Sequence, residues 1–281
     1  MAVTITIANE KGGVGKTTTA VNLAAGLALR FAKTPGPEGR ILLVDMDPQG
    51  HALLSTAYGQ KAARDSESLS ALLTETPPPS IQRLIRPSNR HKNLFIIPSN
   101  HSALVEASRA LPTLMANETR LARALAPIQN QFGFIIIDTP PNTGDLLINS
   151  LVAANLVLIP VETSYLGVSG LRELQKTIDQ VRVHFRPGLK ILGYLPTLCD
   201  EQRSEAQEIL VELSKRFGSD VLPPIHKSAD LTYAHSAHMD VFMYKPPRQR
   251  MDQTLESSSR ATQEYATLVN LVLERTQPNG G

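Results

Sequence analysis

Cysteine is almost absent from this 281-residue sequence, in which Cys199 is the single one. One thiol cannot form an internal disulfide, and it cannot supply the paired thiolates that structural zinc or an iron–sulfur cluster needs. The sequence also has no apolar run approaching the roughly 18 residues that cross a bilayer, and no basic-then-apolar leader precedes the strand-like residues 3–8. A reducing, cytoplasmic compartment is therefore expected, with no membrane partner.

Acidic residues are missing from residues 76–105, although the net charge of the chain is only +2 and its pI is about 8.7. So small a total charge does not by itself indicate a nucleic-acid partner, and local clusters matter more. The cluster in this window fits a solvated face as well as a DNA contact. Its basic residues are Arg83, Arg86, Arg90 and Lys92, with His91 and His101 beside them, and a second group is Lys245, Arg248 and Arg250.

Strand-like apolar runs alternate with helical patterns along the chain, which is typical of βαβ units and a parallel sheet. Several runs are apolar throughout, as expected of strands that helices cover on both faces. We therefore predict an α/β fold, a doubly wound and mostly parallel sheet flanked by helices. It should form a single domain over residues 1–276, followed by a flexible tail at 277–281. The expected strands are 3–8, 41–44, 94–97, 134–137, 156–160 and 191–195, and the expected helices are 17–31, 171–184, 206–217 and 260–274.

A glycine-rich segment joins the first expected strand to the first expected helix. It reads Lys11-Gly12-Gly13-Val14-Gly15-Lys16-Thr17-Thr18. Such a turn lets successive backbone N–H groups converge on a phosphate at the positive end of the helix dipole. Lys16 would then reach the β- and γ-phosphates, and the Thr17 hydroxyl would hold Mg²⁺. The ordinary loop has glycine where this chain has Glu10, and an additional lysine, Lys11, precedes the paired glycines.

Acidic motifs follow two later strands. One reads Val44-Asp45-Met46-Asp47-Pro48-Gln49-Gly50 and the other Asp138-Thr139-Pro140-Pro141. Ligands of doubly wound sheets bind beyond the carboxyl ends of the strands, so Asp45, Asp47 and Asp138 should join the glycine-rich loop in one site. One carboxylate there can hold a water of Mg²⁺, and another can orient the water that attacks the γ-phosphate.

These motifs resemble those of the ParA/MinD family of deviant Walker ATPases, and the resemblance covers nearly the whole chain. The family loop K-G-G-x-G-K-[ST]-T matches residues 11–18 without exception. The D-P-Q-G sequence at 47–50 is typical of the partitioning branch, the Soj-like ParA proteins that have no N-terminal helix-turn-helix domain. The resemblance implies a P-loop ATPase that depends on Mg²⁺ and is stimulated by a partner protein.

The resemblance also implies roles for single residues. Asp47 would position the attacking water, Asp138 would be the Walker B carboxylate, and Asp45 would support the geometry of Thr17 and Mg²⁺. Lys11 would be the signature lysine, which crosses a dimer interface to the ATP of the partner subunit, so that ATP joins two subunits. The implied catalytic residues are Lys11, Lys16 and Asp47, the implied metal ligands are Thr17, Asp45 and Asp138, and the implied ATP contacts are residues 11–18 with Thr197, Pro224 and His226.

In the family, the ATP-bound dimer binds double-stranded DNA without sequence specificity, and a ParB-like partner or cargo adaptor stimulates hydrolysis. The resemblance therefore implies a homodimer at the nucleoid that positions a plasmid, a chromosome or a protein cargo. The chain departs from the family pattern at His226, where arginine is expected, and at 233–238, where Tyr-Ala-His-Ser-Ala-His replaces E-A-x-x-x-G. The residues considered for DNA contact are Arg203, Lys227, Lys245, Arg248 and Arg250.

Three other functions use a related loop. A MinD-like membrane-cycling regulator should end in a basic amphipathic helix, whereas residues 260–274 are apolar on much of their circumference and poorly basic, which is typical of a core helix. A redox protein like the nitrogenase iron protein needs paired cysteines. A ligase that activates a carboxylate is not expected to carry the 47–50 motif. His235 and His238 have i, i+3 spacing, but without a third ligand they are better explained as structural than as metal ligands.

Overall fold

A single sheet carries all the strands of the computed structural model, which describes residues 1–50, 52, 68–142, 144–245 and 259–277. The strand order is β3-β4-β2-β5-β1-β6-β7, and every neighbouring pair is parallel except β3 and β4. The predicted doubly wound, mostly parallel sheet is therefore confirmed. The strands are β1 Val3–Ile7, β2 Ile41–Asp45, β3 Arg86–Pro87, β4 Leu94–Ile97, β5 Phe134–Asp138, β6 Leu156–Glu162 and β7 Lys190–Thr197.

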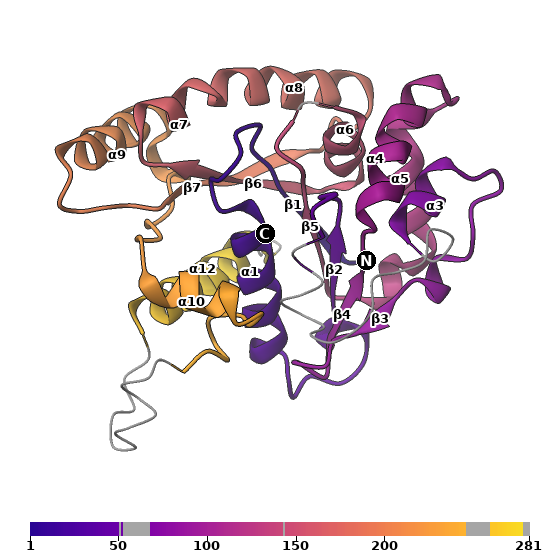
Figure 1. Cartoon of the computed structure of the whole chain (residues 1–281), viewed down its shortest axis with the longest axis horizontal. Coiled ribbons are helices and arrows are strands. Elements are labelled where there is room, and N and C mark those ends of the chain that lie inside the picture. Colours follow the sequence, from indigo (N-terminus) through magenta and orange to yellow (C-terminus); the bar gives the residue numbers. More distant parts are fainter. Residues whose placement is uncertain (51, 53–67, 143, 246–258, 278–281) are drawn as a thin grey trace.

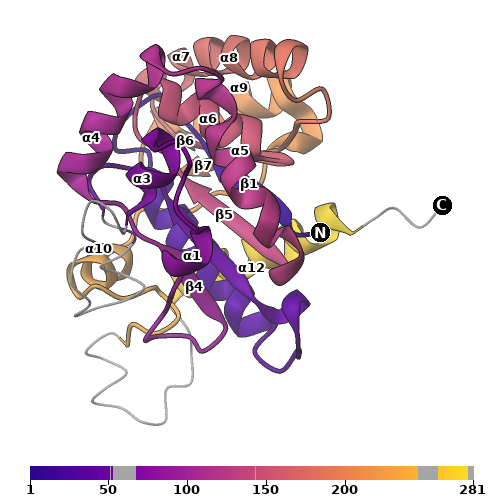
Figure 2. The same ribbon diagram turned by 90° about the vertical axis from the view of Figure 1, so that its right-hand side faces the viewer.

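Helices cover both faces of this sheet (Figure 1, Figure 2). On one face lie α1 Lys16–Arg30, α10 Ala229–Ser236 and α12 Arg260–Thr276. The other helices are α3 Leu69–Thr74, α4 His101–Ala110, α5 Arg120–Leu125, α6 Asp145–Ala153, α7 Tyr165–Ser169, α8 Leu171–His184 and α9 Ser204–Phe217. Short 3₁₀ helices are η1 Pro37–Gly39, η3 Ile81–Arg83, η4 Leu111–Thr113, η5 Asn117–Thr119, η6 Ala126–Gln131 and η7 Gly218–Asp220.

The central strands contribute side chains to a separate hydrophobic core on each face of the sheet, because successive side chains of a strand point to opposite sides. Ile41 and Leu43 of β2 lie in the core shared with α1 and α12, whereas Leu42 and Val44 lie in the core shared with α3, α4 and α5. A third cluster joins β6 and β7 to α6, α8 and α9. The predicted role of the last helix is also confirmed, since α12 buries Ala261, Tyr265, Leu268, Val269 and Val272.

The six expected strands and the four expected helices are all present, with bounds that differ by one or a few residues. β3 was not predicted, because a two-residue antiparallel edge strand that contains proline has no apolar pattern. Of the expected tail, only Gln277 lies within the described residues. In the part of the chain that the structure describes, no helix combines the length and apolar character that crossing a bilayer requires.

The winding of the sheet reverses at β1, which places a crevice at its carboxyl end. β2 and β4 lie on one side of β1 and β6 and β7 on the other. Asp138 pairs in register with Ile7 of β1 and with Asp45 of β2, so these three strands end at the same level. Ligands of open α/β sheets bind at such a reversal, and the glycine-rich loop leaves β1 at this edge.

Candidate functional site

The glycine-rich loop has the backbone conformation of an anion cradle. Gly13 and Gly15 adopt φ angles of +77° and +81°, a left-handed conformation that glycine tolerates best. Gly15 is the N-cap of α1, and the first turn of that helix carries no acidic side chain that would offset its positive end. A Cβ on Gly12 would lie 3.6 Å from Pro141, so the loop packs against the motif that follows β5. Backbone N–H groups at the start of a helix and the helix dipole both favour a phosphate here.

Both lysines of the loop are engaged within the chain. Lys16 is 6% exposed, and its Nζ donates a hydrogen bond of 2.8 Å to the carbonyl oxygen of Lys11. Burial lowers the pKa of Lys16, while Asp138 and Asp47 act in the opposite direction. The ammonium of Lys11 forms an ion pair with Glu162 at the end of β6. Anions that bind the loop must therefore replace one of these partners.

Asp138 is a fully buried carboxylate beside the loop. Burial raises its pKa to about 7, and Asp47 adds to the rise, while the Thr17 hydroxyl and the Lys16 ammonium oppose it. Neither carboxylate oxygen accepts a hydrogen bond of good geometry from the described residues. A buried carboxylate of this kind needs a cation to hold its charge, and Mg²⁺ would supply it. The residues thus fit the metal that the sequence predicts.

Asp45 and Asp47 lie where β2 leaves the sheet. Asp45 is fully buried, and its Oδ1 accepts a hydrogen bond of 3.2 Å from the backbone N–H of Asp47. The Asp47 carboxylate accepts one of 3.0 Å from the N–H of Gln49, and Ser99 Oγ donates to the Asp47 carbonyl oxygen at 3.0 Å. These contacts fix the turn, and Asp47 lies close enough to Lys16 and Asp138 to shift the pKa of each.

A complete protein cage for a metal ion is not found among the described residues, since no three His, Cys, Asp or Glu side chains are grouped to hold one. This result fits Mg²⁺, which is usually held by one or two carboxylates together with phosphate oxygens and water. Thr17 and Asp138 are the candidate oxygen ligands for Mg²⁺, and Asp45 would support them. Within the described residues, the same result groups no third such side chain with His235 and His238.

A hollow of about 260 Å³ lies beside the loop, and we call it the nucleoside hollow. The predicted ATP contacts Thr197 and His226 line it, and Thr197 also donates a hydrogen bond of 2.9 Å to the Val14 carbonyl oxygen of the loop. Pro224 is not among its lining residues, and the neighbouring Ile225 is. The full lining is Gly15, Thr18, Thr197, Leu198, Ile225, His226, Lys227, Ser228, Leu231, Thr232, His235 and Tyr265.

The imidazole of His226 is held by carboxylates on both sides. Its Nδ1 lies 2.6 Å from Glu264 Oε1 and its Nε2 lies 2.9 Å from Glu201 Oε1. Arg260 binds both carboxylates, at 2.7 Å to Glu264 and 2.6 Å to Glu201. His226 lines the nucleoside hollow, and both of its ring nitrogens are engaged by carboxylates.

Three of the five candidate DNA-binding residues lie within the described structure. Arg203 is 69% exposed and lies 3.4 Å from Asp200, Lys227 lines the nucleoside hollow, and Lys245 is exposed. Arg248 and Arg250 lie outside the described residues.

The basic window at 76–105 is partly structural. His91 Nε2 lies 2.9 Å from Asp240 Oδ2, and both side chains are almost completely buried. Arg90 donates a hydrogen bond of 3.2 Å to the His238 carbonyl oxygen. These two residues anchor the window to the segment that follows α10.

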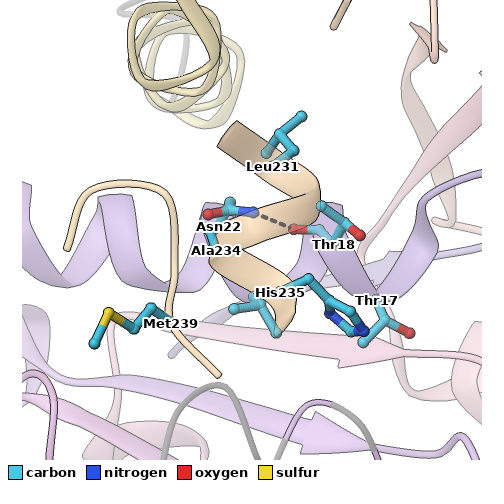
Figure 3. Close-up of a pocket in the computed structure, with 8 residues that line it drawn as sticks. Thr17, Thr18, Asn22, Leu231, Ala234, His235 and Met239 are labelled. Carbon is cyan, nitrogen blue, oxygen red and sulfur yellow. Dashed lines mark hydrogen bonds between the residues drawn. The ribbon is translucent and has the colours of Figure 1, made fainter. Parts of the chain in front are cut away.

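Sequence reasoning missed two features of the site. Leu198 follows β7 and lines the nucleoside hollow with a φ angle of +52°, a conformation that is rare for a bulky residue. Helix α10 places Leu231 and His235 beside Thr18 (Figure 3). The departure from the family pattern at 233–238 was the only signal for the second feature.

Comparison with known proteins agrees with this geometry. A family model described as an AAA domain matches residues 2–191. The chain is 35% identical to the chromosome partitioning protein ParA of Myxococcus xanthus, over 98% of this chain and 89% of that protein. It is also 35% identical to the sporulation initiation inhibitor protein Soj of Bacillus subtilis, over 86% of this chain and 91% of that protein.

Solved structures share the fold. Cobyrinic acid a,c-diamide synthase from Mycobacterium smegmatis with bound ATP analog and magnesium is 27% identical, with a TM-score of 0.78 over 99% of this chain and 96% of that one. Apo McdA from Cyanothece is 21% identical, with a TM-score of 0.79 over 97% of this chain and 100% of that one, a similarity of fold alone. The chain thus belongs to the ParA/MinD family of deviant Walker ATPases, in its Soj-like partitioning branch, and is an ATPase that uses ATP and Mg²⁺.

Proposed function

We propose that this ATPase is a dimerisation switch, which binds DNA without sequence specificity while ATP is bound and positions a plasmid, chromosome or protein cargo at the nucleoid. The observation that carries the proposal is the pair of lysines in one loop. Lys16 is buried and directed back into its own loop, whereas the partly exposed Lys11 ends in an ion pair with Glu162. One lysine serves the ATP of its own subunit, and the other is available to a partner subunit.

ATP binding exchanges internal contacts for phosphate contacts. Lys16 leaves the Lys11 carbonyl oxygen and binds the β- and γ-phosphates. The backbone N–H groups of residues 12–15, Thr17 and Thr18 surround the remaining phosphate oxygens. Lys11 leaves Glu162 and binds the ATP of the partner subunit. The contacts to the γ-phosphate require the triphosphate, so the dimer loses stability when that phosphate departs.

Hydrolysis rests on the carboxylates at the ends of β2 and β5. Thr17 and Asp138, supported by Asp45, would hold Mg²⁺, which would supply positive charge to the phosphate oxygens. Asp47 orients the attacking water in line with the γ-phosphate. Thr197 and Ile225 enclose the adenosine in the nucleoside hollow, where Pro224 and His226 shape the wall from behind.

DNA binding would come from the dimer and not from a single strong patch. The candidate contacts are Arg203, Lys227, Lys245, Arg248 and Arg250, and doubling them across two subunits raises the number of phosphates that are neutralised. Affinity should then fall steeply with salt. A ParB-like partner or cargo adaptor would stimulate hydrolysis and so release the dimer locally. The comparisons name partitioning proteins and do not favour the membrane-cycling alternative.

Electrophoretic retention of an arbitrary duplex tests the switch. Retention is expected with Mg²⁺ and ATP, should be prolonged by Asp47→Ala because hydrolysis is blocked, and should be absent with ADP. Equal retention with ATP and ADP would refute the proposal.

One rival reaction has an observation in its favour, because a similar structure is that of a cobyrinic acid a,c-diamide synthase. An assay of the reaction products separates the two. Release of inorganic phosphate without any added carboxylic acid supports the switch, and strict dependence on such an acid supports a ligase.

A further inference from the structure

A narrow cleft separates α1 from α10, and we call it the α1–α10 cleft (Figure 3). Its volume of about 10 Å³ is close to the space that one water molecule occupies. Thr18, Leu231 and His235 line both this cleft and the nucleoside hollow. These three residues therefore mark the place where the hollow meets the start of α1.

Helix α10 is held at this place by a buried amide. Asn22 of α1 is 4% exposed, and its Nδ2 donates a hydrogen bond of 2.8 Å to the Thr18 carbonyl oxygen (Figure 3). Its Oδ1 accepts one of 2.7 Å from the backbone N–H of Val241, in the segment that follows α10. One side chain thus joins the first turns of α1 to the segment that follows α10.

The imidazole of His235 extends from α10 toward Thr17 (Figure 3), and Thr18 lines the same cleft. Leu231 lies one helical turn earlier, so α10 presents an apolar residue to the nucleoside hollow and a basic residue to the N-terminus of α1. The N-terminus of α1 is where anions are stabilised. A basic side chain directed at that end complements a phosphate.

The expected path of the nucleotide indicates which phosphate group of ATP would lie near His235. With adenosine in the nucleoside hollow and the γ-phosphate near Lys16, the first phosphate after the ribose would pass the junction lined by Thr18 and His235. We propose that His235 binds the α-phosphate of ATP, a contact that rests on the ATP site proposed above. An imidazole N–H would donate to a phosphate oxygen, a charge-assisted hydrogen bond when the ring is protonated.

Replacement of His235 tests this contact. His235→Ala should weaken the binding of Mg-ATP and Mg-ADP equally, by roughly tenfold, because the α-phosphate is common to both. His235→Lys should restore most of the affinity. The matched control is Tyr233→Ala, an exposed residue of the same helix that lines neither space.

Sulfur substitution gives a readout that a structural role would not move. The wild type should discriminate between the two stereoisomers of ATP that carry sulfur on the α-phosphate, because sulfur accepts a hydrogen bond poorly, and His235→Ala should lose part of that discrimination. Unchanged affinity and unchanged discrimination in His235→Ala would overturn the α-phosphate contact alone. Failure of the wild type to bind Mg-ATP would instead overturn the ATP site on which it rests.

Discussion

At the scale of single residues, the site contains charged groups whose burial destabilises the folded chain when no nucleotide is bound. Within the described residues, Asp138 is buried without hydrogen-bond donors of good geometry, and the buried Lys16 donates to the Lys11 carbonyl oxygen. Burying such groups costs free energy, which Mg²⁺ and phosphate would recover on binding. Stability and ligand binding are therefore expected to oppose each other at these positions.

Asp138→Asn should make the nucleotide-free protein more stable and abolish Mg²⁺-dependent hydrolysis. Between about pH 4 and pH 7 the folded chain keeps a proton on Asp138 that the unfolded chain releases, so the free energy of unfolding falls as pH rises through that window. Asparagine should thus raise the free energy of unfolding more near pH 8 than near pH 5, and the difference should be on the order of 2 kcal/mol. Thermal unfolding at the two pH values measures it, and an equal gain at both would contradict the assigned pKa.

Glu162→Gln should favour the ATP-bound dimer, because it releases Lys11 from its ion pair. The two side chains are 28% and 31% exposed, so each pair contributes only about 0.2–1 kcal/mol. A dimer releases two such pairs, and its dissociation constant should fall by less than about thirtyfold. Sedimentation over a concentration series would show it. Glu173→Gln, which breaks the exposed pair with Lys176, is the control. Weaker dimerisation of Glu162→Gln would mean that Glu162 itself acts in the dimer.

Sequence alone located the residues whose role follows from local order along the chain. The loop at 11–18, Asp45, Asp47 and Asp138 are each fixed by their place after a strand, and the structure brings them together. His226 could not be oriented in this way. Its ring is set by Glu264, 38 residues further along, and by Glu201, contacts that no local pattern contains.

At the scale of elements, α1 and α12 approach closely because one of them carries glycine at the contact. A Cβ on Gly26 would lie 2.5 Å from Val269 Cγ2 and 3.0 Å from the ring of Phe242. Hydrophobic periodicity predicted both helices, since each has a buried stripe. It could not predict α10, which buries Ala234 but little else and depends on Asn22 and the nucleoside hollow for its position.

Gly26→Ala should destabilise the fold by about 1–3 kcal/mol, because overpacking at the α1–α12 contact outweighs the gain in helix propensity. The free energy of unfolding in urea would measure the loss. Gly170→Ala serves as the matched control, since Gly170 has a φ angle of −72° and a Cβ there would meet no atom within 4 Å. If the two variants were equally stable, the close approach of the helices would not be a tight contact.

At the scale of the whole molecule, the reversal of winding at β1 gathers the loop, both acidic motifs and the nucleoside hollow at one edge of the sheet. Lys11 and Glu162 lie at the same edge, partly exposed, so two subunits that meet there would face each other's nucleotide. Under the proposed switch, the presence of a triphosphate would then be the condition for pairing.

Light scattering of the purified chain measures this condition most directly. Asp47→Ala with Mg²⁺ and ATP should have the mass of a dimer, whereas the same protein with ADP and the double variant Lys11→Ala, Asp47→Ala with ATP should both have the mass of a monomer. A mass that does not depend on the nucleotide, or a dimer that survives the loss of Lys11, would contradict an ATP-bridged pair of subunits.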